Sequence, residues 1–565
     1  ALTAPGRPLA PTVVAPAPAS AAVVLGVAAV APAATGQVPG TALRLNLGAE
    51  PDTIDPARAS FAGEIEVVMR VFSNLYKTDR QARLVPDQAA GLPDVSADGK
   101  TITVRLKAGL VWSDGKPLTA QDVVYGVKRQ LNPTVASGYA FTLWALHGAR
   151  AYSRANVKTT SEAELQRLRD AVGISAPDAL TVVYQLSQSA PWFPSILATW
   201  CGLPAREDLI TAGGAVEDNQ DWTRDLARYV GNGPYRLTVH DPGARLVFAT
   251  NPRYARGEPP IATVEYAMIK DATVALASYQ AGQLDVIGPK PVGVSAAIKP
   301  AIDRDPVLSQ EYRAVPGACV VYLGLNSTLP PFDNPKVRQA FAAAFDRETL
   351  ATRVLRGLGA ATGQLVPPGV PGHYADIPVQ TFDPAKAKQL LAEAGFPGGK
   401  GLPPIKATYA NVATSELIIT TARAMFAQNL GVDVQLDPIE PRAFAALTKT
   451  QATTPQLFLL GWCQDYPDPQ DWYSTVFQSS STASHTGWHD ATFDRLTRAA
   501  DVETDPKQRG SLYRQAAAIL DAAAPVIFLY DSVAAVLVKP EVKGYTLDPF
   551  EYFFGQHSLD TLKLA

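Results

Sequence analysis

The residues best suited to chemistry in this chain gather in one stretch, 461–473, where carboxylates stand among aromatic side chains and prolines. The stretch follows an apolar run, 457–460, that is typical of a strand. Aromatic rings form stiff apolar walls, and a carboxylate between such walls is a strong partner for a cation. The stretch therefore fits a binding site for a positively charged group. A simple strand exit with incidental aromatics explains the same composition, and residue types alone do not separate the two.

Two patterns offer metal ligands, but both are interrupted. His485 and His489 have the i, i+4 spacing of two ligands on one helix, yet Gly487 and a Ser/Thr-rich run favour a loop there. The three aspartates of the 461–473 stretch alternate with prolines and lack the glycine and terminal glutamate of a calcium loop. We therefore predict no metal site.

Composition and the absence of particular motifs exclude several functional classes of protein. The net charge of −3 gives no concentrated basic field for nucleic acid, and three cysteines exclude a disulfide-dense scaffold or a four-thiolate zinc site. The sequence also lacks a Gly-x-x-x-x-Gly-Lys phosphate loop, a Gly-x-Gly-x-x-Gly dinucleotide loop and a Gly-x-Ser-x-Gly elbow. We predict no cofactor, no nucleic-acid partner and no enzymatic activity.

The elements that must position the candidate site alternate between strands and helices. Apolar and polar residues alternate over 43–47, 101–106 and 432–436, as in half-buried strands, and 526–530 is continuously apolar, as in a strand covered on both faces. This alternation predicts an α/β fold with mixed sheets.

Helix starts are marked by capping residues. Thr119 is followed three residues later by an aspartate, and Asn334, Asp383 and Asp505 each precede a proline at the first helical position. We expect a helix to begin after each of these four residues.

Several segments resemble hallmark motifs of one family in their order along the chain. The chain is similar to the peptide-type, family 5 solute-binding proteins of ABC importers, which include the oligopeptide- and dipeptide-binding proteins. The resemblance covers residues 43–548, almost the whole globular part. The segments that carry it are 112–123, 231–235, 331–340, 390–396, 461–473 and 537–540.

The resemblance implies an α/β, two-lobed periplasmic-binding-protein (Venus-flytrap) fold with three subdomains, mixed sheets and a large cleft that closes by a hinge. Its expected parts are a discontinuous lobe I of residues 41–70, 199–318 and 534–565, an inserted subdomain II of residues 71–198, and a lobe III of residues 319–533.

The resemblance also implies roles for particular residues. Asp465 corresponds to the aspartate that pairs with the α-ammonium group of a peptide, and Trp462 with its neighbour Cys463 corresponds to the wall of the cleft. Tyr139 and Tyr322 correspond to tyrosines that line the cleft. Simple packing is the alternative for the two tyrosines, and a helix cap or surface role is the alternative for Asp465.

A disulfide between Cys319 and Cys463 is a further implication, because some oligopeptide binders carry one at these positions. It would stiffen the strand that leads to Asp465 and suits an oxidising, extracytoplasmic compartment. Two buried free thiols are the alternative. Cys201 has no evident partner, and we expect it to be buried.

The chain differs from the family at the positions that bind the carboxylate end of a peptide. Tight peptide binders can present an arginine three residues before the tryptophan, and a nearby histidine, to the carboxylate of the ligand. Leu459 and, approximately, Ile418 occupy these places. A short-peptide clamp is therefore not evident, and the residue that would bind a ligand carboxylate is not predicted.

We therefore predict a monomeric, extracytoplasmic binding protein that delivers peptides to the permease subunits of an ABC importer. Residues 1–40 are rich in alanine and proline, with Arg7 as their only charged side chain. We expect them to form a tether that anchors the protein to the membrane; the remnant of a signal segment and a non-native extension are the alternatives. The alternatives for function are the same scaffold with an oligosaccharide or other non-peptide solute, and a structural or enzymatic role outside transport.

Overall fold

The structure is a computed structural model that describes residues 42–288, 293–448, 450–481, 483–551 and 554–565. All of them belong to one compact unit, Gly40–Ala565. The predicted tether, 1–40, lies outside the described residues. Within the described part of the chain, no helix combines the length and the apolar character needed to cross a lipid bilayer.

A mixed sheet carries the start of the globular region. Its strands are β1 (Ala42–Asn46), β10 (Thr263–Ala267), β9 (Arg245–Thr250) and β8 (Tyr235–Asp241), in that spatial order. β1 is parallel to β10, and the other neighbours are antiparallel. β1 confirms the strand predicted over 43–47, with the Leu43 and Leu45 side chains buried in the core.

The segment between residues 71 and 198 has sheets of its own. Its strands are β2 (Tyr76–Thr78) paired with β3 (Leu84–Pro86), and the antiparallel sheet β4 (Asp94–Val95), β5 (Thr101–Arg105), β7 (Thr181–Gln185) and β6 (Ile174–Asp178). The helix predicted after Thr119 is α2 (Ala120–Gln130), and the Thr119 backbone N–H donates to Asp122 Oδ2 at 2.7 Å. The domain boundaries themselves stay a prediction.

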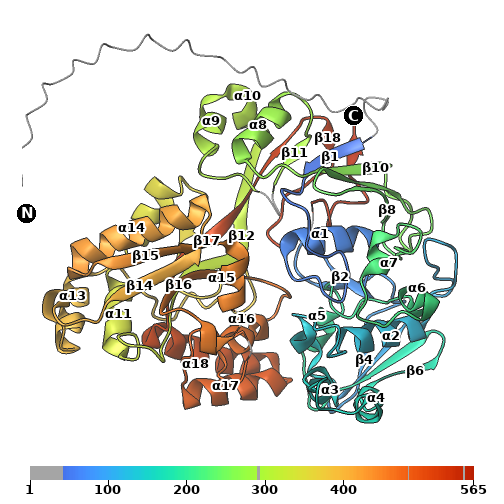
Figure 1. The fold of residues 1–565 in the computed structure, drawn as a ribbon, viewed down its shortest axis with the longest axis horizontal. Coiled ribbons are helices and arrows are strands. Elements are labelled where there is room, and N and C mark those ends of the chain that lie inside the picture. The colour runs from blue at the N-terminus through green and yellow to red at the C-terminus, as the bar shows by residue number, and fades with distance from the viewer. Residues whose placement is uncertain (1–41, 289–292, 449, 482, 552–553) are drawn as a thin grey trace, which may run out of the picture. The chain divides into compact units, whose positions relative to one another are not determined.

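A second mixed sheet organises the remainder of the chain. Its strands are β11 (Val286–Ile287), β17 (Val526–Val538), β12 (Tyr312–Leu325), β16 (Leu457–Cys463), β14 (Ile405–Ala410) and β15 (Val434–Ile439) in spatial order, with β13 (Gly359–Ala361) paired to β17. β14 is parallel to β15 and β16, and the other pairs are antiparallel. β12 and β17 are the longest strands and lie side by side (Figure 1).

Both faces of this second sheet are covered. Leu323 of β12 and Ile527 of β17 pack in one core cluster, whereas Tyr322 and Phe528 point into another. The apolar run predicted over 526–530 is therefore a strand buried on both faces, as expected when helices cover a sheet from both sides.

The predicted helix starts are confirmed. Asn334, Asp383 and Asp505 each accept a backbone N–H of the first helical turn. The helix α14 (Ala413–Leu430) is capped at its C-terminus by Gly431, which adopts the left-handed conformation (φ 71°). The helices before residue 320 are α1 (Ala62–Val71), α2, α3 (Ala149–Ser153), α4 (Glu162–Asp170), α5 (Phe193–Ile196), α6 (Glu207–Ile210), α7 (Asp221–Arg224), α8 (Ala272–Gln280), α9 (Lys299–Arg304) and α10 (Pro306–Glu311). Those after it are α11 (Pro335–Ala343), α12 (Arg347–Thr349), α13 (Pro384–Glu393), α14 (Ala413–Leu430), α15 (Pro441–Leu447), α16 (Pro469–Phe477), α17 (Ala491–Val502) and α18 (Pro506–Ala523).

Candidate ligand-binding site

The aromatic and acidic stretch 461–473 covers the end of β16, the connection that follows it and the beginning of α16. The far end of the connection is fixed by Asp468, whose side chain accepts the Gln470 backbone N–H at 2.9 Å and caps α16. The same carboxylate receives both terminal nitrogens of Arg509, at 2.8 and 2.7 Å. Asp468 is therefore a structural residue that holds the loop against α18.

Asp465 lies in the middle of this connection and is 8% exposed. Its backbone N–H donates to Asp471 Oδ2 at 2.9 Å. A side chain in the first turn of α16 therefore fixes the backbone of the loop at Asp465. Asp471 is fully buried. Burial, and after it the negative charge of Asp465, holds the pKa of Asp471 well above its ordinary range. The acidic side chains of Asp465 and Asp471 are therefore close together and shielded from water.

Tyr139 meets Asp465 from the predicted insert. Burial, together with the negative charge of the nearby Asp465 carboxylate, raises the pKa of Tyr139 well above its ordinary value. The Tyr139 ring packs edge-on against Trp200, with centroids 5.0 Å apart, and lies 5.3 Å from Phe141. The structure thus brings together two predicted site residues that are remote in sequence.

A second aromatic contact joins the same two parts of the chain. Trp192, which precedes α5, stacks on Tyr466 with centroids 6.0 Å apart and rings 25° from parallel. Sequence analysis did not single out this pair. The only local signal was the aromatic dipeptide at residues 192–193, which stands between two prolines. Both of its rings are buried.

The remaining predicted residues lie along the strands below. Trp462 is partly buried against the core on the α16 side of the sheet, and Tyr322 is 1% exposed there, 6.5 Å from the Phe477 ring. Burial raises the pKa of Tyr322 above its ordinary value. Their roles toward a ligand stay predictions. Cys201 is a free, buried thiol, as expected, and burial raises its pKa to about 11.

The predicted disulfide is present in the structure. Cys319 and Cys463 are register partners on β12 and β16, and their sulfur atoms are 2.10 Å apart. Cys463 is the last residue of β16, two positions before Asp465. The bridge therefore fastens the strand end from which the Asp465 loop departs.

Leu459 and Ile418 both lie in the hydrophobic core, with 9% and 1% exposure. Neither position carries a cationic side chain. The arginine and histidine with which tight peptide binders hold a ligand carboxylate therefore have no equivalent at positions 459 and 418.

The residues of the two metal patterns considered in the sequence have the following places in the structure. Asp468, one of the three aspartates of the 461–473 stretch, is engaged by Arg509 and by the α16 cap. His485 and His489 lie outside any helix, as predicted. Among the described residues, the acidic and histidine side chains close enough to hold an ion are in the C-terminal segment instead.

Comparison with known proteins places this arrangement in a family. Residues 83–484 match the family described as bacterial extracellular solute-binding proteins, family 5 Middle. The chain belongs to this family. Its members are binding proteins, and the fold, a two-lobed α/β scaffold with several sheets, agrees with that assignment.

Individual relatives cover nearly the whole chain. It is 28% identical over 514 residues to the oligopeptide-binding protein OppA of Bacillus subtilis, covering 89% of this chain and 90% of the relative. It is 29% identical over 540 residues to the probable deoxycholate-binding periplasmic protein YgiS of Escherichia coli, covering 94% and 95%. The structure of the murein tripeptide binding protein MppA of E. coli aligns with a TM-score of 0.78 at 24% identity, covering 93% and 99%.

Proposed function

We propose that the chain captures peptides outside the cytoplasm and delivers them to the permease of an ABC importer, with no catalytic step. The observation that carries this proposal is the placement of Asp465. It is a largely buried carboxylate that meets Tyr139 across two parts of the chain and stands beside the Trp192–Tyr466 aromatic pair.

The physical argument concerns the cationic end of a peptide. A buried ammonium group is tolerated only against a fixed, hydrogen-bonded opposite charge. The Asp471 carboxylate fixes the backbone at Asp465 by accepting its N–H, and Tyr139 lies near enough to the Asp465 carboxylate for the two groups to interact. Trp462 and Tyr322 would line the cleft on the same side, and residues 1–40 would tether the protein to the membrane.

A second candidate ligand is a neutral or amphipathic solute, such as an oligosaccharide. It is favoured by the lack of a cationic side chain at positions 459 and 418, both of which lie in the hydrophobic core, and one relative is named for deoxycholate. Aromatic walls accept the face of a sugar or steroid as well as a peptide side chain.

Native mass spectrometry of gently purified protein tests the proposal. Co-purifying peptides that the protein releases on denaturation support it. A single sugar or bile-acid mass would favour the second candidate. A chain that never carries a small molecule and does not bind peptides on titration would contradict both.

A further inference from the structure

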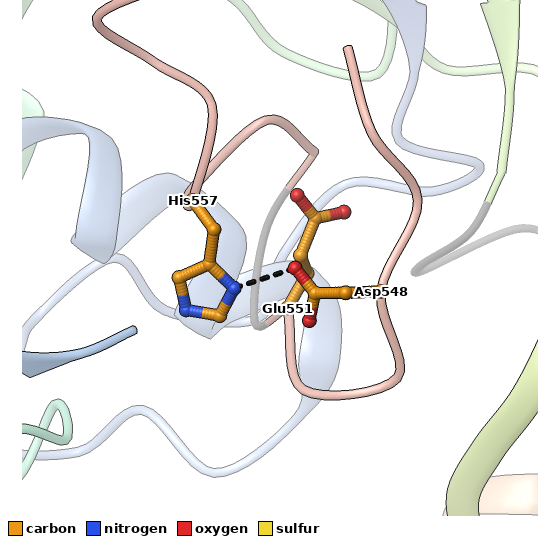
Figure 2. A group of neighbouring side chains, drawn as sticks. All are labelled: Asp548, Glu551 and His557. Carbon is orange, nitrogen blue, oxygen red and sulfur yellow. Dashed lines mark hydrogen bonds and ion pairs between the residues drawn. The ribbon is translucent and has the colours of Figure 1, made fainter. Parts of the chain in front are cut away.

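The C-terminal segment carries a group of acidic and histidine side chains away from the Asp465 loop. It follows β17, and its described strands are β18 (Val542–Lys543) and β19 (Lys563–Leu564). Asp548, Glu551 and His557 each offer one ligand atom, and these atoms lie within 4.8 Å of one another. Figure 2 shows the His557 imidazole in contact with the Asp548 carboxylate, and the Glu551 carboxylate beside this pair.

Each of the three side chains is oriented by a separate donor or acceptor outside the group. Asp548 Oδ1 accepts the Phe550 backbone N–H at 2.9 Å, and Glu551 Oε2 accepts the Tyr545 hydroxyl at 3.0 Å. His557 Nε2 lies 3.5 Å from the Thr78 hydroxyl of β2. Of the second polar atoms of these side chains, Asp548 Oδ2 and His557 Nδ1 bond to each other, and Glu551 Oε1 has no hydrogen-bond partner within the described residues. Outer partners of this kind are what orients the ligands of a metal ion.

The inner atoms are only partly satisfied within the group. Asp548 Oδ2 and His557 Nδ1 are 2.6 Å apart, a hydrogen-bond distance at which a proton joins them, and an ion bound by both atoms would replace that proton and move them apart. Glu551 is 2% exposed, and its Oε1 is buried with no hydrogen-bond partner within the described residues. Such an orphan carboxylate oxygen is costly unless a ligand completes it.

The surroundings add negative charge. Glu66 of α1 is fully buried, and its carboxylate interacts electrostatically with Glu551. Arg70 forms an ion pair with Glu66 at 3.3 Å. Three buried carboxylates, those of Glu66, Asp548 and Glu551, therefore share this neighbourhood with His557, with Arg70 and with Arg313, which donates to the Tyr545 carbonyl oxygen at 3.2 Å.

We propose that Asp548, Glu551 and His557 form a binding site for a divalent transition-metal cation of the Zn²⁺ type. Two carboxylate oxygens and one imidazole nitrogen are suitable ligands for Zn²⁺, which accepts three protein ligands and one water in a tetrahedron. Because His557 also contacts Thr78, the ion would fix the C-terminal segment to the β2 region of the chain. It would act as a structural clip, separate from capture of the transported solute.

Titration of the metal-free full chain with ZnCl₂ tests this proposal. We expect one equivalent of Zn²⁺ to remain bound after gel filtration, by elemental analysis, and the melting temperature to rise with Zn²⁺ concentration, since an ion that binds only the folded state stabilises it. In Glu551→Gln the amide oxygen still accepts the Tyr545 hydroxyl, but the anionic ligand is lost. We expect at least tenfold weaker Zn²⁺ binding and no shift in melting temperature.

The matched control is His489→Gln, which removes an exposed histidine that lies 3.5 Å from Asp494. It should bind Zn²⁺ like the unmodified protein. Asp548→Asn replaces Glu551→Gln if the latter does not fold, with the same expected loss. The proposal is overturned if the unmodified chain retains no Zn²⁺, or if the cluster variant binds it as tightly as the control. Either result would mean that Asp548, Glu551 and His557 form a hydrogen-bonded network without a metal ion.

Discussion

Replacing both cysteines of the disulfide with serine should cost a large share of the stability of the protein. Cys319 and Cys463 are separated by 144 residues in sequence, so the bridge closes a long loop that contains α11 to α15 and most of β16. The chain-entropy model assigns about 5 kcal/mol to closing a loop of this length in the unfolded state. Since measured bridges typically deliver about 2–4 kcal/mol, we expect a loss between about 2 and 5 kcal/mol.

Urea unfolding followed by tryptophan fluorescence measures this loss, because Trp462 and Trp472 flank the bridged strand end. The oxidised protein should unfold at a higher urea concentration than Cys319→Ser/Cys463→Ser. A reducing agent should lower the midpoint of the unmodified protein to that of the double variant and leave the variant unchanged. Coincident midpoints for the oxidised protein and the variant would refute the reasoning that the loop is constrained.

Two further predictions concern the acidic residues of the β16–α16 connection. In Asp471→Asn the amide can still accept the Asp465 N–H. Because burial raises the pKa of Asp471 in the folded state, its stabilising contribution is present at low pH and lost as pH rises through the raised value. Urea unfolding should therefore show the variant more stable than the unmodified protein at pH 8, by up to about 1.4 kcal/mol for each unit by which the pKa of Asp471 is raised, and no difference at pH 3; a pH-independent difference would be contrary evidence. Asp468→Ala removes a helix cap and leaves Arg509 without its carboxylate, and we expect a loss of about 3 kcal/mol by the same method. A loss below 1 kcal/mol would mean that the pair is not structural.

Much of the fold could be predicted because its signals are local. Alternation over 43–47 and 101–106 marks strands, and the Asn334 and Asp505 caps fix where α11 and α18 begin. The loop that carries Asp465 could be predicted from its aromatic and acidic composition together with a family resemblance.

The residues that complete the site could not be predicted, because their contacts join distant segments. Nothing in the sequence near Trp192 indicates that it stacks on Tyr466, and nothing separates the capping role of Asp468 from the orienting role of Asp471. Those roles follow from the direction in which α16 leaves the loop.

The C-terminal cluster was missed for the same reason. Asp548, Glu551 and His557 have irregular spacing, and the outer partner of the histidine is 479 residues away in β2. A pattern of that kind becomes visible only after the chain has folded.

A comparison of one peptide with and without an acetylated N-terminus tests the central claim about Asp465 most directly. Isothermal titration should show that acetylation weakens binding to the unmodified protein by at least about 30-fold, the equivalent of losing one partner of a buried charge pair. With Asp465→Asn, both peptides should bind with the same weak affinity. Equal affinity of the two peptides for the unmodified protein, or an acetylation penalty that survives in Asp465→Asn, would contradict the assignment of Asp465 to the cationic end of the ligand.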